Sequence, residues 1–203
     1  MSRGLGDVYK RQITDRMAAY VEPLAAACQI VEQVHVRPTD RVMVVGDGKL
    51  GLLIGQVLAL TGCDLTIIGH HRDKLDILAA RGISTRIGVE GLDASADLVV
   101  ECTGQAEGFR TARRLLRPGA TLVLKSTYHD QVHTDLSSLV VDEIQVVGSR
   151  CGPFPAALRL LAQGLVDVES LIEAVYPLQE AQAAFEHASR RGALKVLVRT
   201  GRN

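Results

Sequence analysis

One glycine-rich turn constrains the fold of this chain more than any other feature of its 203 residues. It joins "RVMVVG" (Arg41–Gly46), a short apolar run typical of a buried parallel strand, to "KLGLLIGQVLALTG" (Lys49–Gly62), which has helical spacing. Between them, Gly46, Gly48 and Gly51 form the pattern G-x-G-x-x-G. The first glycine permits a tight turn, the second lets backbone approach a pyrophosphate, and the third lets the helix pack close to the strand. This strand, turn and helix predict a dinucleotide-binding site.

The amino terminus of the predicted helix strengthens that prediction. Its first N–H groups have no partner within the helix, and the helix dipole places partial positive charge beside them. Both features favour a phosphate group at this end of the helix. The residues predicted to bind the cofactor here are Gly46, Gly48, Lys49, Leu50 and Gly51.

Strands and helices alternate along the chain as far as about residue 150. This order predicts parallel βαβ units, and hence an α/β fold with a doubly wound parallel sheet of the Rossmann type. A helix is also expected within Ala18–Val36, ahead of the first strand. The further strands are expected at Asp64–Gly69, Ser84–Gly88, Ala96–Gly104, Ala120–Ser126 and Asp142–Arg150, and the further helices at Arg72–Gly82 and Ala106–Gly119.

The sequence after Gly152 follows a different order. A helix ("FPAALRLLAQG") precedes "LIEAVYPL", a second helix ("QEAQAAFEHASRRG") and a last strand, "ALKVLVRT". The backbone of these short strands needs hydrogen-bond partners that the first sheet does not obviously supply. We therefore expect this end of the chain to belong to another structural unit.

Composition argues against several other classes of protein. The net charge is zero and aromatic residues make up only 3%, which is unlike a nucleic-acid-binding protein. No run approaches the ~20 apolar residues of a membrane span, and the amino terminus lacks the apolar segment of a signal peptide. No C-x-x-C pair is present, so we expect reduced thiols in a cytoplasmic protein. The cysteines are Cys28, Cys63, Cys102 and Cys151.

The end of the second strand bears on which dinucleotide is bound. An NAD-binding protein usually has Asp or Glu there to hold the ribose hydroxyls. This chain has Gly69, His70, His71 and Arg72 instead. Without a carboxylate nothing repels a 2′-phosphate, and Arg72 with one or both histidines could donate hydrogen bonds to it. We therefore expect NADP, with NAD as the second choice; the alternative is a solvated loop in which Asp73 offsets the charge of Arg72.

Five stretches give the chain a resemblance to the medium-chain dehydrogenase/reductase superfamily, in particular to its zinc-dependent branch typified by sorbitol and threonine dehydrogenases. They are "VEPLAAA", "VVGDGKLG", "VVECTG", "LRPGATLVL" and "YPLQEAQAAFEHASRRGALKVLV". Together they span nearly everything from Val21 onward, in the order that the family has. The resemblance implies a two-domain subunit, in which an amino-terminal catalytic domain holds zinc and a Rossmann domain holds the cofactor.

The resemblance also implies domain boundaries. Residues 13–37 would be the end of the catalytic domain and a linking helix, residues 38–150 the Rossmann domain, and residues 151–203 a segment that returns to the catalytic domain. The strands without partners in the tail fit that return. The catalytic domain is expected to be incomplete, because the family's cysteine, His-Glu pair and proton relay belong to sequence that is not in this chain.

Glu22 is the residue that the resemblance connects with zinc. In sorbitol-dehydrogenase-like members, a Glu-Pro-Leu about this far before the glycine loop supplies an acidic group to the catalytic zinc site, and carboxylate oxygens bind zinc. Spacing alone would make Glu22 a helix-start glutamate stabilised by the dipole, but the match of "VEPLAAA" favours the zinc role. The histidines show no metal-binding spacing; they are His35, His70, His71, His129, His133 and His187.

Further cofactor contacts follow from the resemblance. Cys102, Thr103 and Gly104 would lie near the nicotinamide ribose, although a plain strand-to-helix turn explains Cys102 equally well. Lys195 matches the family's basic residue that reaches the pyrophosphate, and is otherwise a surface lysine. Lys125 stands where the family backbone touches the nicotinamide and usually has small or apolar residues. Its side chain is expected to face either the substrate or the solvent.

The resemblance implies an oxidoreductase of the alcohol dehydrogenase type. A hydride would pass between an alcohol carbon and C4 of the nicotinamide, with zinc as the Lewis acid in the intact protein. This chain alone is expected to be inactive, because Glu22 would be its only zinc ligand. The intact protein is expected to act on a small alcohol or carbonyl substrate as a homo-oligomer. The alternatives are a zinc-independent NADPH quinone reductase and a non-catalytic nucleotide-binding module.

The first twelve residues match no part of this organisation. "DVYKRQ" (Asp7–Gln12) can be encoded by the codons GAT-GTG-TAT-AAG-AGA-CAG, which joined form the mosaic-end sequence of transposase-based sequencing libraries. Other codons encode the same peptide, so the DNA sequence tests this hypothesis. We interpret residues 1–12 as a sequencing-adapter artefact rather than as a disordered basic arm.

Overall fold

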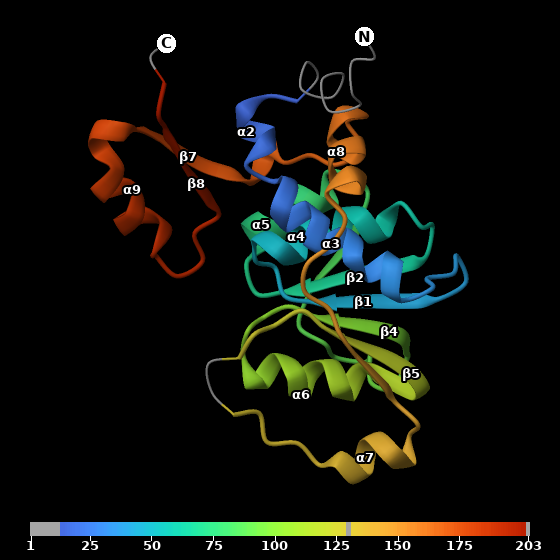
Figure 1. Cartoon of the computed structure of the whole chain (residues 1–203). Helices are drawn as coiled ribbons and strands as arrows, with labels where there is room; N and C mark the ends of the chain where they lie inside the picture. The colour runs from blue at the N-terminus through green and yellow to red at the C-terminus, as the bar shows by residue number, and fades with distance from the viewer. Residues whose placement is uncertain (1–12, 129–130, 202–203) are drawn as a thin grey trace.

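In the described part of the chain, the larger of two sheets has the predicted architecture. The computed structural model describes residues 13–128 and 131–201, so the stretch interpreted as an adapter artefact lies outside it. The larger sheet has six parallel strands in the order β3-β2-β1-β4-β5-β6 (Figure 1). The order reverses beside β1, which confirms the predicted doubly wound α/β fold. The strands are β1 (Arg41–Val45), β2 (Asp64–Gly69), β3 (Ser84–Ile87), β4 (Ala96–Glu101), β5 (Leu116–Leu124) and β6 (Gln145–Gly148).

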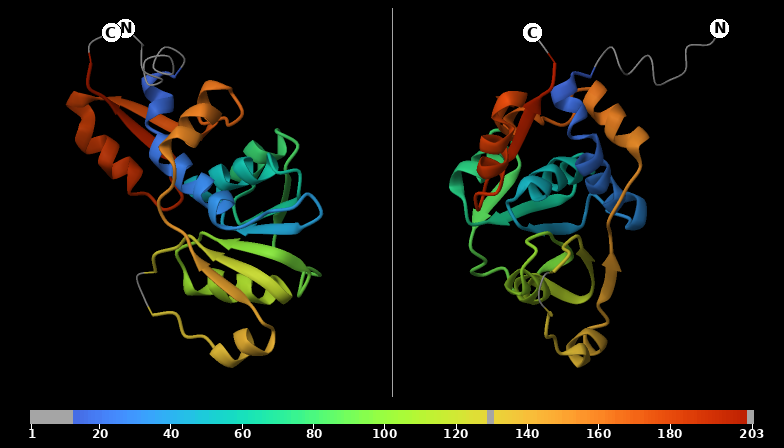
Figure 2. Two further views of the ribbon diagram at one scale, coloured as in Figure 1. Left: turned by 45° about the vertical axis from the view of Figure 1, so that its right-hand side comes forward. Right: turned by 60° about the vertical axis from the view of Figure 1, so that its left-hand side comes forward.

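Helices cover both faces of this sheet (Figure 2). One face lies under α3 (Val21–Gln33), α4 (Lys49–Ala59), α5 (Arg72–Ala79) and α8 (Phe154–Ala162), and the other lies against α6 (Ala106–Leu115). A four-residue helix, α2 (Asp15–Ala18), precedes α3.

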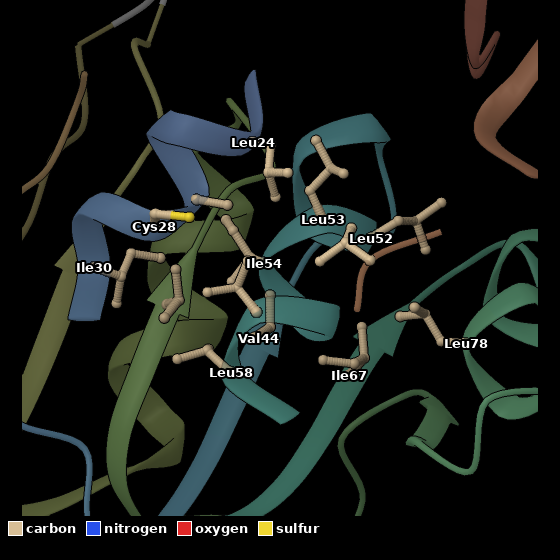
Figure 3. Packing of buried hydrophobic residues seen from close by; sticks show 14 of the residues in the cluster. Leu24, Cys28, Ile30, Val44, Leu52, Leu53, Ile54, Leu58, Ile67 and Leu78 are labelled. Carbon is tan, nitrogen blue, oxygen red and sulfur yellow. The ribbon is translucent and has the colours of Figure 1, made fainter. Parts of the chain in front are cut away.

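Two cores result, because successive side chains of a strand point to opposite faces. Val42 and Val44 of β1 belong to the core under α3 and α4, whereas Met43 and Val45 belong to the core against α6. Figure 3 shows the first core, in which Val44 and Ile67 of the sheet lie close to Ile54 of α4. Every one of these strand residues is buried, which explains why the predicted strands read as continuous apolar runs.

The boundary between α6 and β5 differs from the prediction. A helix was expected over Ala106–Gly119, but α6 ends at Leu115 and β5 begins at the next residue. Pro118 has no N–H to donate within a helix, and Gly119 has φ of 74°. The strand instead pairs with Ala96 at its start and resumes regular pairing later, after a register shift. The helix α7 (Leu136–Val141) is an addition to the elements expected from the sequence.

The tail forms a separate two-stranded sheet in the described part of the chain. β7 (Ile172–Pro177) pairs in parallel with β8 (Lys195–Arg199), and α9 (Ala181–Ala188) connects them. Two short 3-10 helices, η1 (Glu169–Leu171) and η2 (Leu178–Glu180), flank β7. Figure 1 shows this unit beside the six-stranded sheet, close to α2.

Several large apolar side chains are exposed. Val140 and Val141 of α7 are 76% and 79% exposed, and Phe185 of α9 is 75% exposed. Val146 on the edge strand β6 is also exposed. Within residues 13–128 and 131–201, no helix combines the length and apolar character needed to cross a membrane.

Candidate nucleotide-binding site

The glycine loop connects β1 to α4 at the carboxyl edge of the sheet. Gly46 has φ of 128°, and a side chain there would begin 2.9 Å from Cys102 Sγ. A side chain at Gly51 would begin 2.0 Å from the Gly46 carbonyl oxygen, so only glycine allows the helix to start this close to the loop. By contrast, no atom lies within 4 Å of the corresponding position at Gly48. Gly46 and Gly51 thus serve packing, while Gly48 borders open space.

The amino terminus of α4 faces that open space. Gly48 is the N-cap residue and provides no side-chain cap for the first turn. The first turn contains Lys49, Leu50 and Gly51, the residues predicted to offer N–H groups to phosphate. Gly48 and Lys49 are exposed, whereas Gly51 is buried. The helix has eleven residues, and its uncapped, accessible amino terminus can accept an anion from solvent.

Lys195 brings the two-stranded sheet to the same place. Burial lowers the pKa of Lys195, the positive charge of Lys49 lowers it further, and the carboxylate of Glu22 opposes both effects. The Lys195 ammonium also lies 5.4 Å from the centre of the Tyr20 ring. Segments far apart in the sequence therefore bring two lysines toward one helix amino terminus, and such positive charges favour an anion there.

A carboxylate stands at the end of β2, contrary to the expectation from the sequence. Asp47, in the glycine loop, turns toward β2, and Oδ2 accepts hydrogen bonds from the backbone N–H groups of His70 (2.7 Å) and His71 (2.6 Å). The ring Nδ1 of His71 lies 3.0 Å from Oδ2 and 3.1 Å from Oδ1. Burial alone would raise the pKa of Asp47, but the hydrogen bonds from His71 and His70 outweigh it and keep this pKa low. The premise that no negative charge opposes a 2′-phosphate here is therefore wrong.

The start of α5 meets the turn that precedes β8. Arg72, the first residue of α5, is exposed, whereas Lys74 is buried. A methyl group placed on Gly192 would lie 3.2 Å from Lys74 Nζ and 3.8 Å from His71 Nε2. The turn at Gly192 thus lies beside the side chains of Lys74 and His71. The sequence reasoning missed Lys74, because its neighbour is far along the chain.

The turn after β4 is organised by a buried glutamate. Glu101 is fully buried, and Oε1 accepts hydrogen bonds from the N–H (2.7 Å) and hydroxyl (2.6 Å) of Thr103. The hydroxyl of Tyr128 donates to Oε2. Burial and the hydrogen bond to Glu101 raise the pKa of Tyr128. Gly104 has φ of 74°, and its N–H donates to Ser126 Oγ (2.7 Å).

Glu101 was not among the predicted site residues. Its place as the last residue of a buried strand at the ligand-binding edge is a signal that the sequence did contain.

Cys102 packs beneath the glycine loop. Its Sγ lies 3.3 Å from the Val45 carbonyl oxygen and 3.7 Å from that of Gly46. Burial raises the pKa of this thiol, and the negative charges of Glu101 and Asp47 raise it further. Cys102 is therefore a neutral thiol at physiological pH, and its contacts are those of a packing residue.

Lys125 takes neither of the two orientations expected for it. Its ammonium points into the protein and donates hydrogen bonds to the Ala26 carbonyl (2.7 Å), the Arg150 carbonyl (2.9 Å) and Ser149 Oγ (3.2 Å). Burial lowers the pKa of Lys125. The ammonium links the end of β5 to α3 and to the segment that follows β6.

Glu22 lies on the first turn of α3 and is exposed. Its charge acts on both Lys125 and Lys195. Over the described ranges, no group of three or more His, Cys, Asp or Glu side chains could hold a metal ion; His129 falls outside those ranges. These residues therefore do not form a zinc site by themselves, since zinc needs about three protein ligands.

Comparison with known proteins bears on the family of this chain. The sequence signature of the family described as "Glucose dehydrogenase C-terminus" matches residues 16–199. A protein of Agrobacterium fabrum assigned as a D-xylulose reductase is 32% identical over 184 residues, which cover 84% of this chain and 53% of that protein. A sorbitol dehydrogenase of Halalkalibacterium halodurans is 29% identical over 204 residues, covering 92% of this chain and 59% of that protein.

A solved structure is also similar to this chain. A Sinorhizobium meliloti 1021 protein described as a zinc-binding dehydrogenase, solved with NADP bound, superposes with a TM-score of 0.81 at 25% identity; the match covers 91% of this chain and 59% of that one. The chain thus spans between half and three fifths of the length of the relatives it matches. The family signature covers most of the chain, so the chain belongs to the glucose dehydrogenase C-terminus family, within the medium-chain dehydrogenase/reductase superfamily.

Proposed function

We propose that this chain is the nicotinamide-dinucleotide-binding part of an alcohol dehydrogenase that acts on polyols. The observation that carries the proposal is the uncapped start of α4, with open space at Gly48 and with Lys49 and Lys195 nearby. Relatives that reduce D-xylulose or oxidise sorbitol, by their names, support the polyol substrate class.

The residues divide the work of holding the cofactor. The N–H groups of Lys49, Leu50 and Gly51, with the ammonium of Lys195, would bind the pyrophosphate. The His70–Arg72 turn would face the adenosine ribose, and the Cys102–Gly104 turn would border the nicotinamide ribose. The bound nicotinamide supplies a hydride acceptor for the alcohol carbon.

Zinc requires ligands beyond those described here. Glu22 is one carboxylate in reach of the Lys125 and Lys195 charges, and we propose that it serves zinc only when further ligands come from elsewhere in the whole protein. The chain by itself is then expected to bind nucleotide without oxidising alcohols. A zinc-independent quinone reductase would instead retain activity after chelation of metal.

We also propose a location and an oligomeric state for the intact protein. The four free cysteines are in keeping with a cytoplasmic protein. Exposed apolar side chains on α7 and on the edge strand β6 are in keeping with a homo-oligomer in the intact protein. Gel filtration of the whole protein would test the second point.

Fluorescence titration of the chain with NADH and NADPH tests the cofactor proposal. We expect binding, and we expect Lys195→Ala to weaken it at least about tenfold, because a charge-assisted contact to the pyrophosphate is lost. Arg37→Ala removes an exposed positive charge from the turn before β1, at the other edge of the sheet, and serves as the matched control. Equal losses in the two variants, or no binding to the unaltered chain, would contradict the proposal.

A further inference from the structure

We propose that Asp47 replaces the ribose-facing carboxylate that the end of β2 lacks, and that it lowers the affinity for NADPH relative to NADH. This inference rests on the proposed dinucleotide site. It concerns the choice between the two cofactors, for which the sequence analysis expected NADP because no carboxylate was seen and Arg72 with one or both histidines could donate to a 2′-phosphate.

The first argument is steric. Gly69 is the last residue of β2, the position at which a nicotinamide dinucleotide fold usually carries its acid. A side chain at Gly69 would begin 2.4 Å from Asp47 Oδ2 and 2.5 Å from Asp47 Cβ. The Asp47 side chain therefore occupies the volume in which a side chain of residue 69 would stand. A carboxylate of the glycine loop thus lies where a carboxylate of β2 would lie.

The second argument is the hydrogen-bond count. The N–H groups that follow β2 are natural donors to a 2′-phosphate, but those of His70 and His71 already donate to Asp47 Oδ2. Nδ1 of the His71 ring also contacts this carboxylate. Arg72 and Lys74 remain as the positive side chains of this turn. A 2′-phosphate would thus meet two main-chain donors that already bind Asp47, and the negative charge of the Asp47 carboxylate.

The third argument is electrostatic. Asp47 is buried, so water screens its charge poorly. A ribose 2′-hydroxyl carries no charge, whereas a 2′-phosphate carries close to two negative charges at neutral pH. Repulsion from Asp47 therefore acts on NADPH and leaves NADH unaffected. Arg72 and Lys74 oppose this repulsion, and the balance sets the ratio of the two affinities.

The substitution Asp47→Asn tests the inference, because it keeps the shape and an oxygen acceptor for the backbone N–H groups while removing the charge. Dissociation constants for NADH and NADPH are measured on the full chain by fluorescence titration. We expect the affinity ratio of NADPH to NADH to rise about tenfold. The control Asp76→Asn removes an exposed charge from α5, one turn after Arg72. It is expected to leave the ratio of the two affinities within about twofold.

A second variant guards against loss of the fold, which thermal melting would reveal. Exchanging the two residues, with Asp47→Gly and Gly69→Asp together, returns the carboxylate to β2 and is expected to preserve the unaltered ratio. The inference would be overturned if Asp47→Asn changed both affinities equally, or if the ratio rose tenfold in the exchanged variant. Either result would leave the proposed function standing. Failure of the unaltered chain to bind either nucleotide would overturn the proposed function as well.

Discussion

The two sheets of this protein are stabilised in different ways. In the six-stranded sheet, Val42, Met43 and Val44 of β1 are all at most 1% exposed, with helices on both faces. In the two-stranded sheet, none of the residues of β7 or β8 is buried, and α9 packs on these strands. An isolated two-stranded sheet is marginal in water, so the second unit must draw its stability from other contacts.

Polar contacts supply much of what the second unit lacks. The ring of His187 contacts the Tyr176 hydroxyl at Nδ1 (3.0 Å) and Glu173 Oε1 at Nε2 (2.7 Å). Glu173 Oε2 accepts a hydrogen bond from the Leu194 N–H (2.6 Å), next to Lys195. Tyr20 links this unit to α3, because its hydroxyl donates to the Leu171 carbonyl (2.6 Å). One sheet thus has a large apolar core, and the other combines the packing of α9 with a chain of specific hydrogen bonds.

The largest expected effect lies in the apolar core. Leu53 of α4 is 0% exposed, and Leu53→Ala is expected to lower the free energy of unfolding by about 3 kcal/mol, because it leaves a cavity. Urea denaturation of the chain measures the change. Leu60, in the same helical run, is 48% exposed, so Leu60→Ala is the matched control and should cost less than about 1 kcal/mol. Similar costs for the two variants would break the contrast between core and surface.

The next effect tests the link between the two sheets. Tyr20→Phe leaves the buried Leu171 carbonyl without its partner and is expected to cost about 1–2 kcal/mol of unfolding free energy. Tyr176→Phe removes a hydrogen bond inside the second unit and should cost less, since that contact is only partly buried. If Tyr176→Phe proved the more costly, the second unit would depend on its own network more than on its attachment.

The smallest effect concerns pH. The hydrogen bonds from Leu194 and His187 lower the pKa of Glu173 below that of an unfolded glutamate. The stabilisation that this provides is present above the unfolded pKa and is lost as pH falls through the folded pKa. Amide hydrogen exchange in β8, corrected for intrinsic rates, should therefore speed up a few-fold as pH falls from about 6 to about 4.

Glu173→Gln provides the control for this experiment, because glutamine does not titrate. Its β8 amides should show the same corrected exchange rates at both pH values. A persistent acceleration in this variant would assign the pH dependence to another group.

The sequence predicted features whose parts lie next to one another in the chain. The roles of Gly46, Gly48 and Gly51 follow from a motif of six residues, and the geometry of the turn agrees with it. The alternation of apolar runs predicted the strands of the larger sheet, because burial on both faces leaves a continuous apolar signal. The end of α6 was misplaced, because the pairing of β5 with Ala96 outweighed the helical pattern.

The sequence did not predict contacts between residues that are far apart in the chain. Asp47 meets residues 23 and 24 positions away, and Lys125 donates to a carbonyl 99 positions away. Neither pairing has a local pattern, since a side chain's direction at a strand end depends on what packs around it. The interpretation that β2 ends without an acidic residue is correct, because Gly69 is its last residue. The interpretation that no carboxylate lies beside this end is wrong, because Asp47 of the glycine loop lies there.

By itself, the sequence determined the Rossmann fold, the glycine loop and the family, because local propensity and the burial pattern act within short stretches. Only the tertiary structure decided which charges face the site. It placed Asp47 at the end of β2, turned Lys125 inward and brought Lys195 toward Lys49. Electrostatic environments are set by distance in space, and folding alone brings these distant charges together.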